Sequence, residues 1–200
     1  MNRNKIVHEG LRLRGFTAEL LSEGPDMDGP LDVALQVLLN PLMRMAYGKE
    51  LTPEHLKYCP WAVIIKQRES PEEIVAACTL TFYWDDPCYF VTHFEAVVPA
   101  LQRSGFGRAL FECVESATRF IAVNDFYVAS NMVQSDMTFD IVSFIDTVDA
   151  QSDNNQHGHG TFLRKLGFEL ADYDYSHDPN TEIAFSKRIA LQNQMDPNLN

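Results

Sequence analysis

Basic residues, paired cysteines and long apolar runs are all scarce in this sequence of 200 residues. Lysine and arginine together number 16 against 28 aspartates and glutamates, so the formal net charge is −12. Such an excess of negative charge repels nucleic-acid phosphates, and we expect no nucleic-acid partner. No apolar run approaches the roughly 20 residues that span a bilayer, and the first residues lack the apolar stretch of a secretory signal. We therefore expect a cytoplasmic or nuclear protein that does not enter a membrane.

The cysteines show none of the short paired spacings that are typical of metal or redox motifs. They lie at Cys59, Cys78, Cys88 and Cys113, and we expect reduced, mostly buried thiols. His157 and His159 are separated by a single glycine, which is weak evidence for a metal ligand pair. We expect no metal site.

The composition is that of an ordinary globular chain, with 46% hydrophobic and 11% aromatic residues. We expect one domain over residues 1–190 and a disordered polar tail over residues 191–200. Residues 11–22 indicate a strand or a strand plus turn, and residues 31–46 carry apolar positions at helical spacing. Within that helix Pro41 is expected to cause a break or a kink.

Strand-forming residues dominate the next part of the chain. Runs rich in β-branched and aromatic residues at 61–65, 74–84 and 88–98 predict an antiparallel meander. An amphipathic helix follows from Phe106, with Leu110, Val114, Ala117 and Ile121 on one stripe. Residues 126–129 then predict a short strand, parallel to an earlier one through a right-handed crossover. A short helix over 161–166 that ends at Gly167, and strands near 169–175 and 182–187, complete the pattern.

The segment 131–158 fits this pattern least. It contains five aspartates and no lysine or arginine, and its middle part, residues 139–148, is compatible with a helix or a strand. We interpret residues 131–158 as an acidic insertion, because long loops in compact domains are usually functional or mobile.

The loop between the third strand and the amphipathic helix carries the chemistry. Gly105 and Gly107 permit a tight turn that exposes backbone N–H groups. The helix start adds unsatisfied N–H donors and partial positive charge, and Arg103 and Arg108 add two guanidinium groups to a strongly acidic chain. Together these features favour a pyrophosphate ligand. The alternative is a tight strand-to-helix turn without a ligand.

This loop resembles the signature of the GNAT superfamily of acyl-CoA N-acyltransferases, in which Gln or Arg is followed by two variable residues, Gly, one variable residue and Gly or Ala. Gln102, Gly105 and Gly107 satisfy it, and the short helix with Phe162 that ends in Gly167-Phe168 resembles a second family feature. The resemblance covers roughly residues 61–187. It implies an α/β (α+β) fold with a mixed, mostly antiparallel central sheet, a splayed parallel pair of strands and flanking helices.

The resemblance also implies acetyl-CoA as co-substrate. Backbone groups of Ala96, Val97 and Val98 are expected to bond the pantetheine arm, and the loop amides are expected to hold the pyrophosphate. The implied cofactor-binding residues of the loop are Gln102, Arg103, Ser104, Gly105, Phe106, Gly107 and Arg108. Asn131 and Phe162 are further cofactor-binding candidates, although Asn131 also suits a turn at a strand end.

The acceptor is expected to be an amine that attacks the thioester directly in a ternary complex. His93 and Glu95 are the candidate bases, because two residues that are two positions apart on a strand project to the same face; His93 matches a base position in relatives that acetylate aralkylamines. A packed histidine and a solvent-facing carboxylate are the respective alternatives. The family's usual tyrosine proton donor is replaced by Leu163, and Tyr173 is our main substitute, with Tyr175 and Tyr127 as others.

The acidic segment 131–158 favours a cationic acceptor, either a small amine or a peptide amine, because negative potential concentrates cations. Leu163 also supports an alternative, namely a catalytically weak or inactive protein that binds acyl-CoA as a regulator. The sequence therefore predicts an acetyl-CoA-dependent N-acetyltransferase, with that regulator as the second reading.

Overall fold

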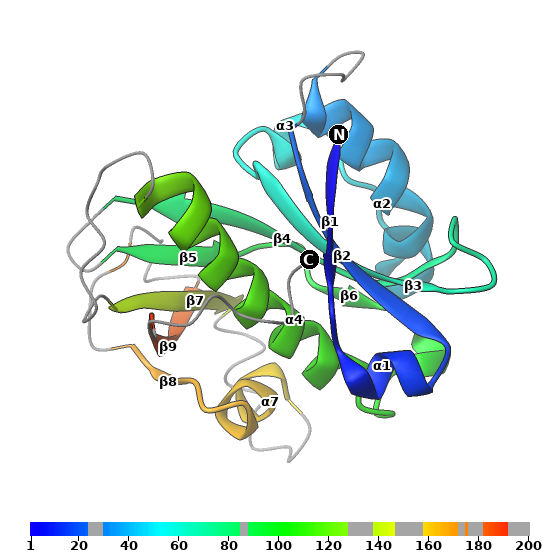
Figure 1. Ribbon diagram of the computed structural model, residues 1–200. Helices are drawn as coiled ribbons and strands as arrows, with labels where there is room; N and C mark the ends of the chain where they lie inside the picture. Colours follow the sequence, from blue (N-terminus) through cyan, green and yellow to red (C-terminus); the bar gives the residue numbers. More distant parts are fainter. Residues whose placement is uncertain are drawn as a thin grey trace. The chain divides into compact units, whose positions relative to one another are not determined.

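The computed structural model describes residues 1–23, 30–84, 88–127, 138–146, 158–171, 175 and 182–191. The chain divides into two compact units (Figure 1). Unit 1 takes its described residues from Met1–Thr81 and Phe94–Gln134, and unit 2 from Phe82–His93 and Ser135–Gln192. The single domain over residues 1–190 stays a prediction, and the expected tail lies almost wholly outside the described residues.

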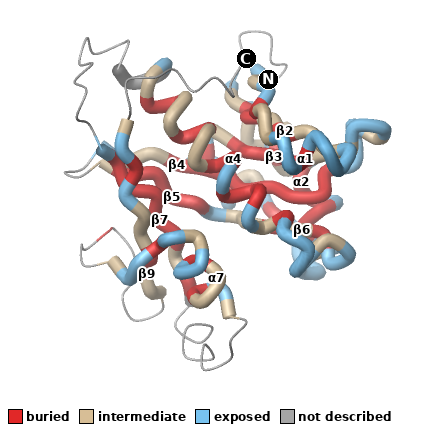
Figure 2. The backbone as a smooth tube through the Cα atoms, turned by 60° about the horizontal axis from the view of Figure 1, so that its bottom comes forward, coloured by how far each residue is buried: buried red, intermediate tan, exposed pale blue. Residues whose placement is uncertain are grey.

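Unit 1 is built on antiparallel strands in the order β1-β2-β3-β4, with β6 paired to β4. Their bounds are Asn2–Ile6 (β1), Phe16–Ser22 (β2), Trp61–Gln67 (β3), Ile74–Tyr83 (β4) and Ala96–Val97 (β6). Strands β3 and β4 are rich in valine, isoleucine and alanine and are buried along most of their length (Figure 2), as strands covered on both faces are. The predicted strands over 61–65 and 74–84 are confirmed.

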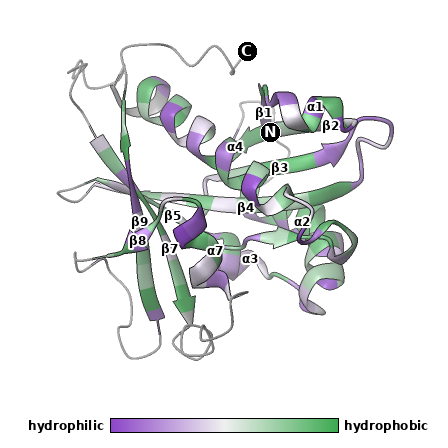
Figure 3. Cartoon of the chain, turned by 90° about the horizontal axis from the view of Figure 1, so that it is seen from below, coloured by the Kyte–Doolittle hydropathy of each residue, from purple (hydrophilic) through white to green (hydrophobic). Residues whose placement is uncertain are grey.

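Helices cover both faces of these strands. Unit 1 contains α1 (Glu9–Leu13), α2 (Leu31–Tyr47), α3 (Pro53–Leu56), the 3-10 turn η1 (Pro99–Leu101), α4 (Phe106–Ile121) and the π-helical segment η2 (Ala122–Tyr127). Figure 3 shows α1 and α4 on one side of β3 and β4, with α2 and α3 on the other. The predicted stripe of α4 is confirmed, because Leu110, Val114, Ala117 and Ile121 are all buried. None of the helices in the described part of the chain is long and apolar enough to cross a membrane.

Helix α2 runs through Pro41, so the expected break at this residue is wrong. A proline in a helix interior costs about 3 kcal/mol. The buried side chains Leu39, Leu42 and Met43 lie on both sides of Pro41, and their burial offsets this cost because each large apolar side chain contributes about 2 kcal/mol.

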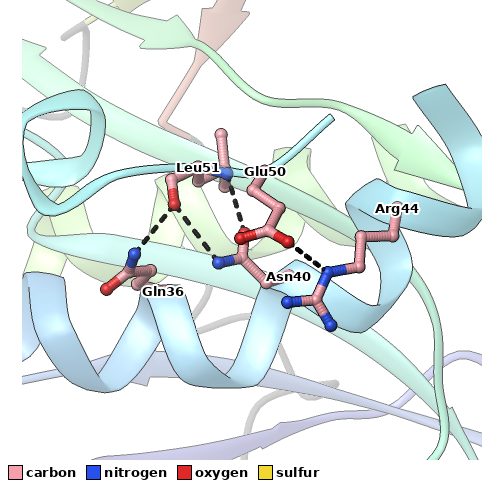
Figure 4. Close-up of polar contacts among 5 residues, drawn as sticks. All are labelled: Gln36, Asn40, Arg44, Glu50 and Leu51. Carbon is pink, nitrogen blue, oxygen red and sulfur yellow. Dashed lines mark hydrogen bonds and ion pairs between the residues drawn. The ribbon is translucent and has the colours of Figure 1, made fainter. Parts of the chain in front are cut away.

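A buried asparagine ties α2 to the loop that follows it. Asn40 accepts a hydrogen bond from Leu51 N–H through Oδ1 (2.7 Å) and donates to the Leu51 carbonyl through Nδ2 (3.2 Å). Gln36 donates to the same carbonyl (3.0 Å), and Arg44 pairs with Glu50 at the surface (2.6 Å; Figure 4). Asn40 therefore satisfies both backbone polar groups of Leu51, which are costly to bury unpaired.

Unit 2 contains the parallel strand pair. Its strands follow the order β5-β7-β9-β8, with bounds Tyr89–Thr92 (β5), Thr138–Asp146 (β7), Glu182–Ala190 (β9) and Glu169–Leu170 (β8). Strands β5 and β7 are parallel, whereas β7 with β9 and β8 with β9 are antiparallel. The helix α7 (His159–Lys165) is followed by Gly167 at φ 87°, which confirms the predicted short helix and its glycine stop.

The second strand of the parallel pair lies later in the chain than expected. The predicted strand at 126–129 is wrong at Phe126 and Tyr127, which belong to the π-helical segment that continues α4. Residues 138–146 form β7, so the part of the expected acidic insertion that was compatible with a helix or a strand is a strand. Nearly every described residue of β7 is buried, so the strand lacks the alternation that identifies a half-buried strand.

One of the five aspartates in that segment is a structural residue. Asp140 of β7 is 3% exposed and accepts two hydrogen bonds from Arg188, at 2.9 and 3.0 Å. Tyr175 donates to the same carboxylate at 2.9 Å. Because its charge is paired inside unit 2, Asp140 does not provide the acceptor-attracting potential expected of it.

We predict that Asn40→Ala lowers the free energy of unfolding by about 2 kcal/mol, because it leaves the Leu51 N–H in the buried loop without its acceptor, while the Leu51 carbonyl keeps only its bond from Gln36. Urea denaturation measures this loss. Glu50→Gln is the matched control, since it breaks only the exposed Arg44–Glu50 pair in the same loop and is expected to leave stability unchanged. Equal losses in the two variants would contradict the role assigned to Asn40.

The pH dependence of stability tests Tyr175. Burial raises the pKa of Tyr175 to about 12, and its hydrogen bond to Asp140 adds to this rise. An unfolded tyrosine loses its proton near pH 10, so between about pH 10 and 12 the unfolded state holds fewer protons and stability falls as pH rises. Tyr175→Phe is expected to flatten this alkaline fall in urea titrations, whereas Tyr58→Phe, at a tyrosine that is 68% exposed, is expected to leave it unchanged.

Candidate functional site

The segment that leads into the glycine loop runs antiparallel to β4. Ala96 pairs with Ala77 and Val97 with Ala76, and Val98 N–H donates to the Val75 carbonyl at 2.9 Å. At Phe94 a side chain replaces the strand ladder, because Phe94 N–H donates to the hydroxyl of the fully buried Thr79 at 3.2 Å. This segment is therefore held against β4 from residue 94 to residue 98.

Antiparallel pairing decides which backbone groups face away from β4. Residues that bond to β4, such as Val98, alternate along the chain with residues whose N–H and C=O point to the opposite edge. Glu95 and Val97 are of the second kind. Two side chains reach their carbonyls: Tyr47 at the end of α2 donates to the Glu95 carbonyl at 2.5 Å, and Gln102 donates through Nε2 to the Val97 carbonyl at 3.1 Å. The Tyr47 hydroxyl and the Gln102 side-chain amide therefore hold two carbonyls on the edge along which the pantetheine arm was predicted to lie.

The strand geometry assumed for His93 and Glu95 is wrong. Residues 93–95 fall between β5 and β6 and have no strand assignment, so alternation along a strand does not place the two side chains on one face. His93 is exposed and belongs to unit 2, whereas Glu95 is half-buried and belongs to unit 1. Their catalytic roles stay predictions.

The Glu95 carboxylate lies in a partly buried setting within unit 1. Its Oε2 atom is buried. Burial raises the pKa of the Tyr47 hydroxyl and of the Cys78 thiol, and the negative charge of Glu95 raises both further. Burial likewise raises the pKa of Cys59, and it raises that of Cys113 to about 12. These three buried cysteines therefore remain neutral thiols and are unsuited to nucleophilic attack at neutral pH.

The glycine loop is a turn with two left-handed residues. After η1, Arg103 has φ 58° and Gly105 has φ 91°. Positive φ is strained for a residue with a Cβ atom and free of that strain for glycine. Alternating right- and left-handed residues make successive N–H groups converge on one concave side, which is an anion-binding arrangement.

The amides at the start of α4 precede the helical hydrogen-bond ladder. Ala109 is the first to bond backward, to the Gly105 carbonyl at 3.0 Å. Among the residues that the structure describes, none accepts a hydrogen bond from the N–H of Arg103, Gly105, Phe106, Gly107 or Arg108. The first turn of α4 carries no acidic residue, so the partial positive charge of the helix start is not neutralised locally.

Ser104 shapes the loop from within. Its hydroxyl donates to the Leu101 carbonyl at 2.5 Å, and its N–H approaches the same atom at 3.4 Å. Both donors of Ser104 therefore close the turn.

The sequence patterns did not identify one basic residue that contacts this loop. Arg14, between α1 and β2, donates through Nη1 to the Ser104 carbonyl at 3.1 Å, and its Cζ lies 4.1 Å from the centroid of the Phe106 ring. Phe16 packs edge-on against the same ring, with 4.7 Å between centroids. No local pattern marks this contact, because Arg14 and Ser104 are 90 residues apart.

The remaining candidates lie in unit 2 or outside the described residues. Phe162 is half-buried on α7, with its ring 6.0 Å from that of His159. Asn131 and Tyr173 fall outside the described residues, as does the side chain of Tyr127. Tyr175 is 1% exposed and donates to Asp140, so it is committed to the interior of unit 2. In the described ranges, no group of three or more His, Cys, Asp or Glu side chains is arranged to hold a metal ion.

Comparison with solved structures identifies the fold. A GNAT family N-acetyltransferase, YhbS, from Escherichia coli in complex with CoA, superposes with a TM-score of 0.50 at 11% identity, covering 84% of this chain and 81% of that one. The fold is that of the GNAT acetyltransferases. It has the mostly antiparallel sheet, the parallel pair β5–β7 and the flanking helices, so the predicted fold class is confirmed.

Two further GNAT-fold structures have lower TM-scores. The ribosomal-protein-S18-alanine N-acetyltransferase of Escherichia coli gives 0.49 at 13% identity, covering 90% of this chain and 97% of that one. A GNAT family acetyltransferase from Elizabethkingia anophelis with acetyl-CoA bound gives 0.45 at 15% identity, covering 86% and 98%. No family model and no curated protein matches the sequence. The activity must therefore be argued from the residues of this chain.

Proposed function

We propose that this protein transfers the acetyl group of acetyl-CoA to an amine. The observation that carries the proposal is the set of backbone amides between Arg103 and Arg108, at the start of α4, for which no described residue is an acceptor. A diphosphate needs several hydrogen-bond donors and positive charge, and a helix start with a glycine turn supplies both. The exposed guanidinium groups of Arg103 and Arg108 add charge at the same place.

The pantetheine arm is proposed to lie along the edge of β6 that faces away from β4. Val97 presents its N–H and C=O to that edge, while Ala96 and Val98 bond to β4 and hold Val97 in position. Gln102 fixes the Val97 carbonyl. Its place in the motif is thereby explained, because it connects the pantetheine edge to the pyrophosphate loop. Asn131 and Phe162 stay predicted cofactor contacts.

Glu95 is proposed as the base. An alkylammonium has a pKa of about 10 and must lose a proton before it attacks. The amine nitrogen then bonds to the acetyl carbonyl carbon and gives up a second proton, the carbon–sulfur bond breaks, and the CoA thiolate takes up a proton. Glu95 stands two residues before Val97, next to the proposed pantetheine edge, and the Tyr47 hydroxyl holds its backbone. His93 is the alternative base, and Tyr173 the predicted donor to the thiolate.

The acceptor is proposed to be a cationic small amine or peptide amine. The net charge of −12 attracts cations over the whole surface, and the partly buried Glu95 carboxylate offers a local partner for an ammonium group.

A specific observation supports a second candidate, a protein that binds acyl-CoA without turnover. Leu163, which follows Phe162 at the family's usual tyrosine position, is completely buried on α7 and has no proton to donate. Assay of free CoA release with a panel of amines separates the two functions, because a regulator binds acetyl-CoA and releases none.

We predict that Gly105→Glu abolishes acetyl-CoA binding in calorimetry. A side chain at φ 91° strains the turn, and its carboxylate repels the diphosphate. Gly48→Glu is the matched control, since Gly48 also has positive φ (65°) and open surroundings but ends α2. The control is expected to bind as the wild type does; equal binding by the Gly105 variant would contradict the loop assignment.

We predict that Glu95→Gln lowers kcat about 100-fold, the usual size of general-base catalysis, and leaves the Kd of acetyl-CoA unchanged. Tyr47→Phe, which removes the donor to the Glu95 carbonyl, is expected to lower kcat by about tenfold, the value of one hydrogen bond. Thiol detection of released CoA measures both. A loss confined to His93→Gln, with Glu95→Gln fully active, would transfer the role of base to His93.

A further inference from the structure

Arg14 contacts the glycine loop on the side of the Ser104 carbonyl. Its Nη1 donates to the Ser104 carbonyl at 3.1 Å. In a trans peptide the C=O of one residue and the N–H of the next point in opposite directions. The Ser104 carbonyl points to Arg14, so the N–H of Gly105 points away from it, toward the ligand side of the turn.

The guanidinium also fixes the first residue of α4. Phe106 is fully buried, and its ring contacts both Arg14, with Cζ 4.1 Å from the ring centroid, and Phe16 at 4.7 Å between centroids. A stacked guanidinium has a fixed plane and can donate to a carbonyl while it covers an aromatic ring. Arg14 therefore sets the orientation of the Ser104–Gly105 peptide and of the start of α4 together.

This contact lies next to a strained backbone position. Arg103 has φ 58°, which strains a residue with a Cβ atom, whereas Gly105 takes its positive φ without that strain. A strained turn persists when surrounding contacts over-determine it. The hydroxyl of Ser104 closes the turn by donating to the Leu101 carbonyl, and Arg14 holds the Ser104 carbonyl. The neighbouring carboxylate of Glu9 pairs with Arg12, whereas Arg14 bonds to the loop.

We infer that Arg14 is a positioning residue for diphosphate recognition: it holds the Ser104 carbonyl and the Phe106 ring so that the amides from Gly105 onward meet the diphosphate of the cofactor. Arg14 does not itself contact the ligand, because it lies on the carbonyl side of the peptide. The inference rests on the proposed function, since it assigns to Arg14 the preorganisation of the same loop.

The test compares Arg14→Gln with Arg12→Gln by calorimetry, using acetyl-CoA, ADP and pantetheine as separate ligands. Both variants remove one exposed arginine from neighbouring positions, but Arg12 pairs with Glu9 and does not touch the loop. Arg14→Gln is expected to raise the Kd of acetyl-CoA and ADP about tenfold, the value of one charge-assisted contact. Pantetheine, which lacks the diphosphate, is expected to bind both variants as it binds the wild type. Arg12→Gln is expected to leave all three unchanged.

Measurements at high salt distinguish a loss of loop orientation from a loss of electrostatic attraction between Arg14 and the ligand. At about 1 M sodium chloride the Debye length is about 3 Å, so a loss due to charge alone disappears, whereas a loss of orientation persists. Arg14→Lys keeps the charge without the planar stack on Phe106 and is expected to recover only part of the affinity. Circular dichroism checks that each variant is folded.

The outcomes distinguish this inference from the function on which it rests. Wild-type protein that binds neither acetyl-CoA nor ADP overturns both. Wild-type binding with an unchanged Arg14→Gln, a loss that vanishes at high salt, or an equal loss for pantetheine overturns the role of Arg14 alone.

Discussion

The amide groups at the start of α4 are the feature on which the functional site depends. A helix leaves its first N–H groups without intrahelical partners, and here the loop before it turns through Arg103 and Gly105 at positive φ. Arg103, Gly105, Phe106, Gly107 and Arg108 thus offer donors that the described part of the chain does not use. The side chains that shape this turn, those of Ser104 and Arg14, bond to carbonyl groups and do not use these donors. This arrangement suits an anion, as the proposed function requires.

The segment before the loop follows a related principle. From Phe94 to Val98 the chain is bound to β4, either by backbone bonds or through the Thr79 hydroxyl. Antiparallel alternation turns the carbonyls of Glu95 and Val97 to the other edge, where Tyr47 and Gln102 hold them. A carboxylate, a backbone edge and an anion-binding turn follow one another within about a dozen residues. That order suits a ligand with an acyl group at one end and a diphosphate at the other.

Local patterns predicted the parts of this site that depend on neighbouring residues. The spacing of Gln102, Gly105 and Gly107 predicted the loop, and the apolar stripe from Leu110 to Ile121 predicted α4, because a turn and an amphipathic helix are determined within a few residues. The second parallel strand was misplaced, since β7 is buried on both faces and shows no alternation. Tyr47 and Arg14 were missed because their partners lie 48 and 90 residues away, and no short pattern records such contacts.

Binding of a diphosphate by the backbone amides of the loop is measured by two-dimensional ¹H–¹⁵N NMR of the wild-type protein, titrated with ADP. Hydrogen bonds to phosphate shift amide protons downfield, so we expect saturable downfield shifts at Gly105, Phe106 and Gly107, with Gly48 and Gly167 unmoved. Loop signals that stay in place at saturating ADP, or shifts that centre on another part of the chain, would contradict it.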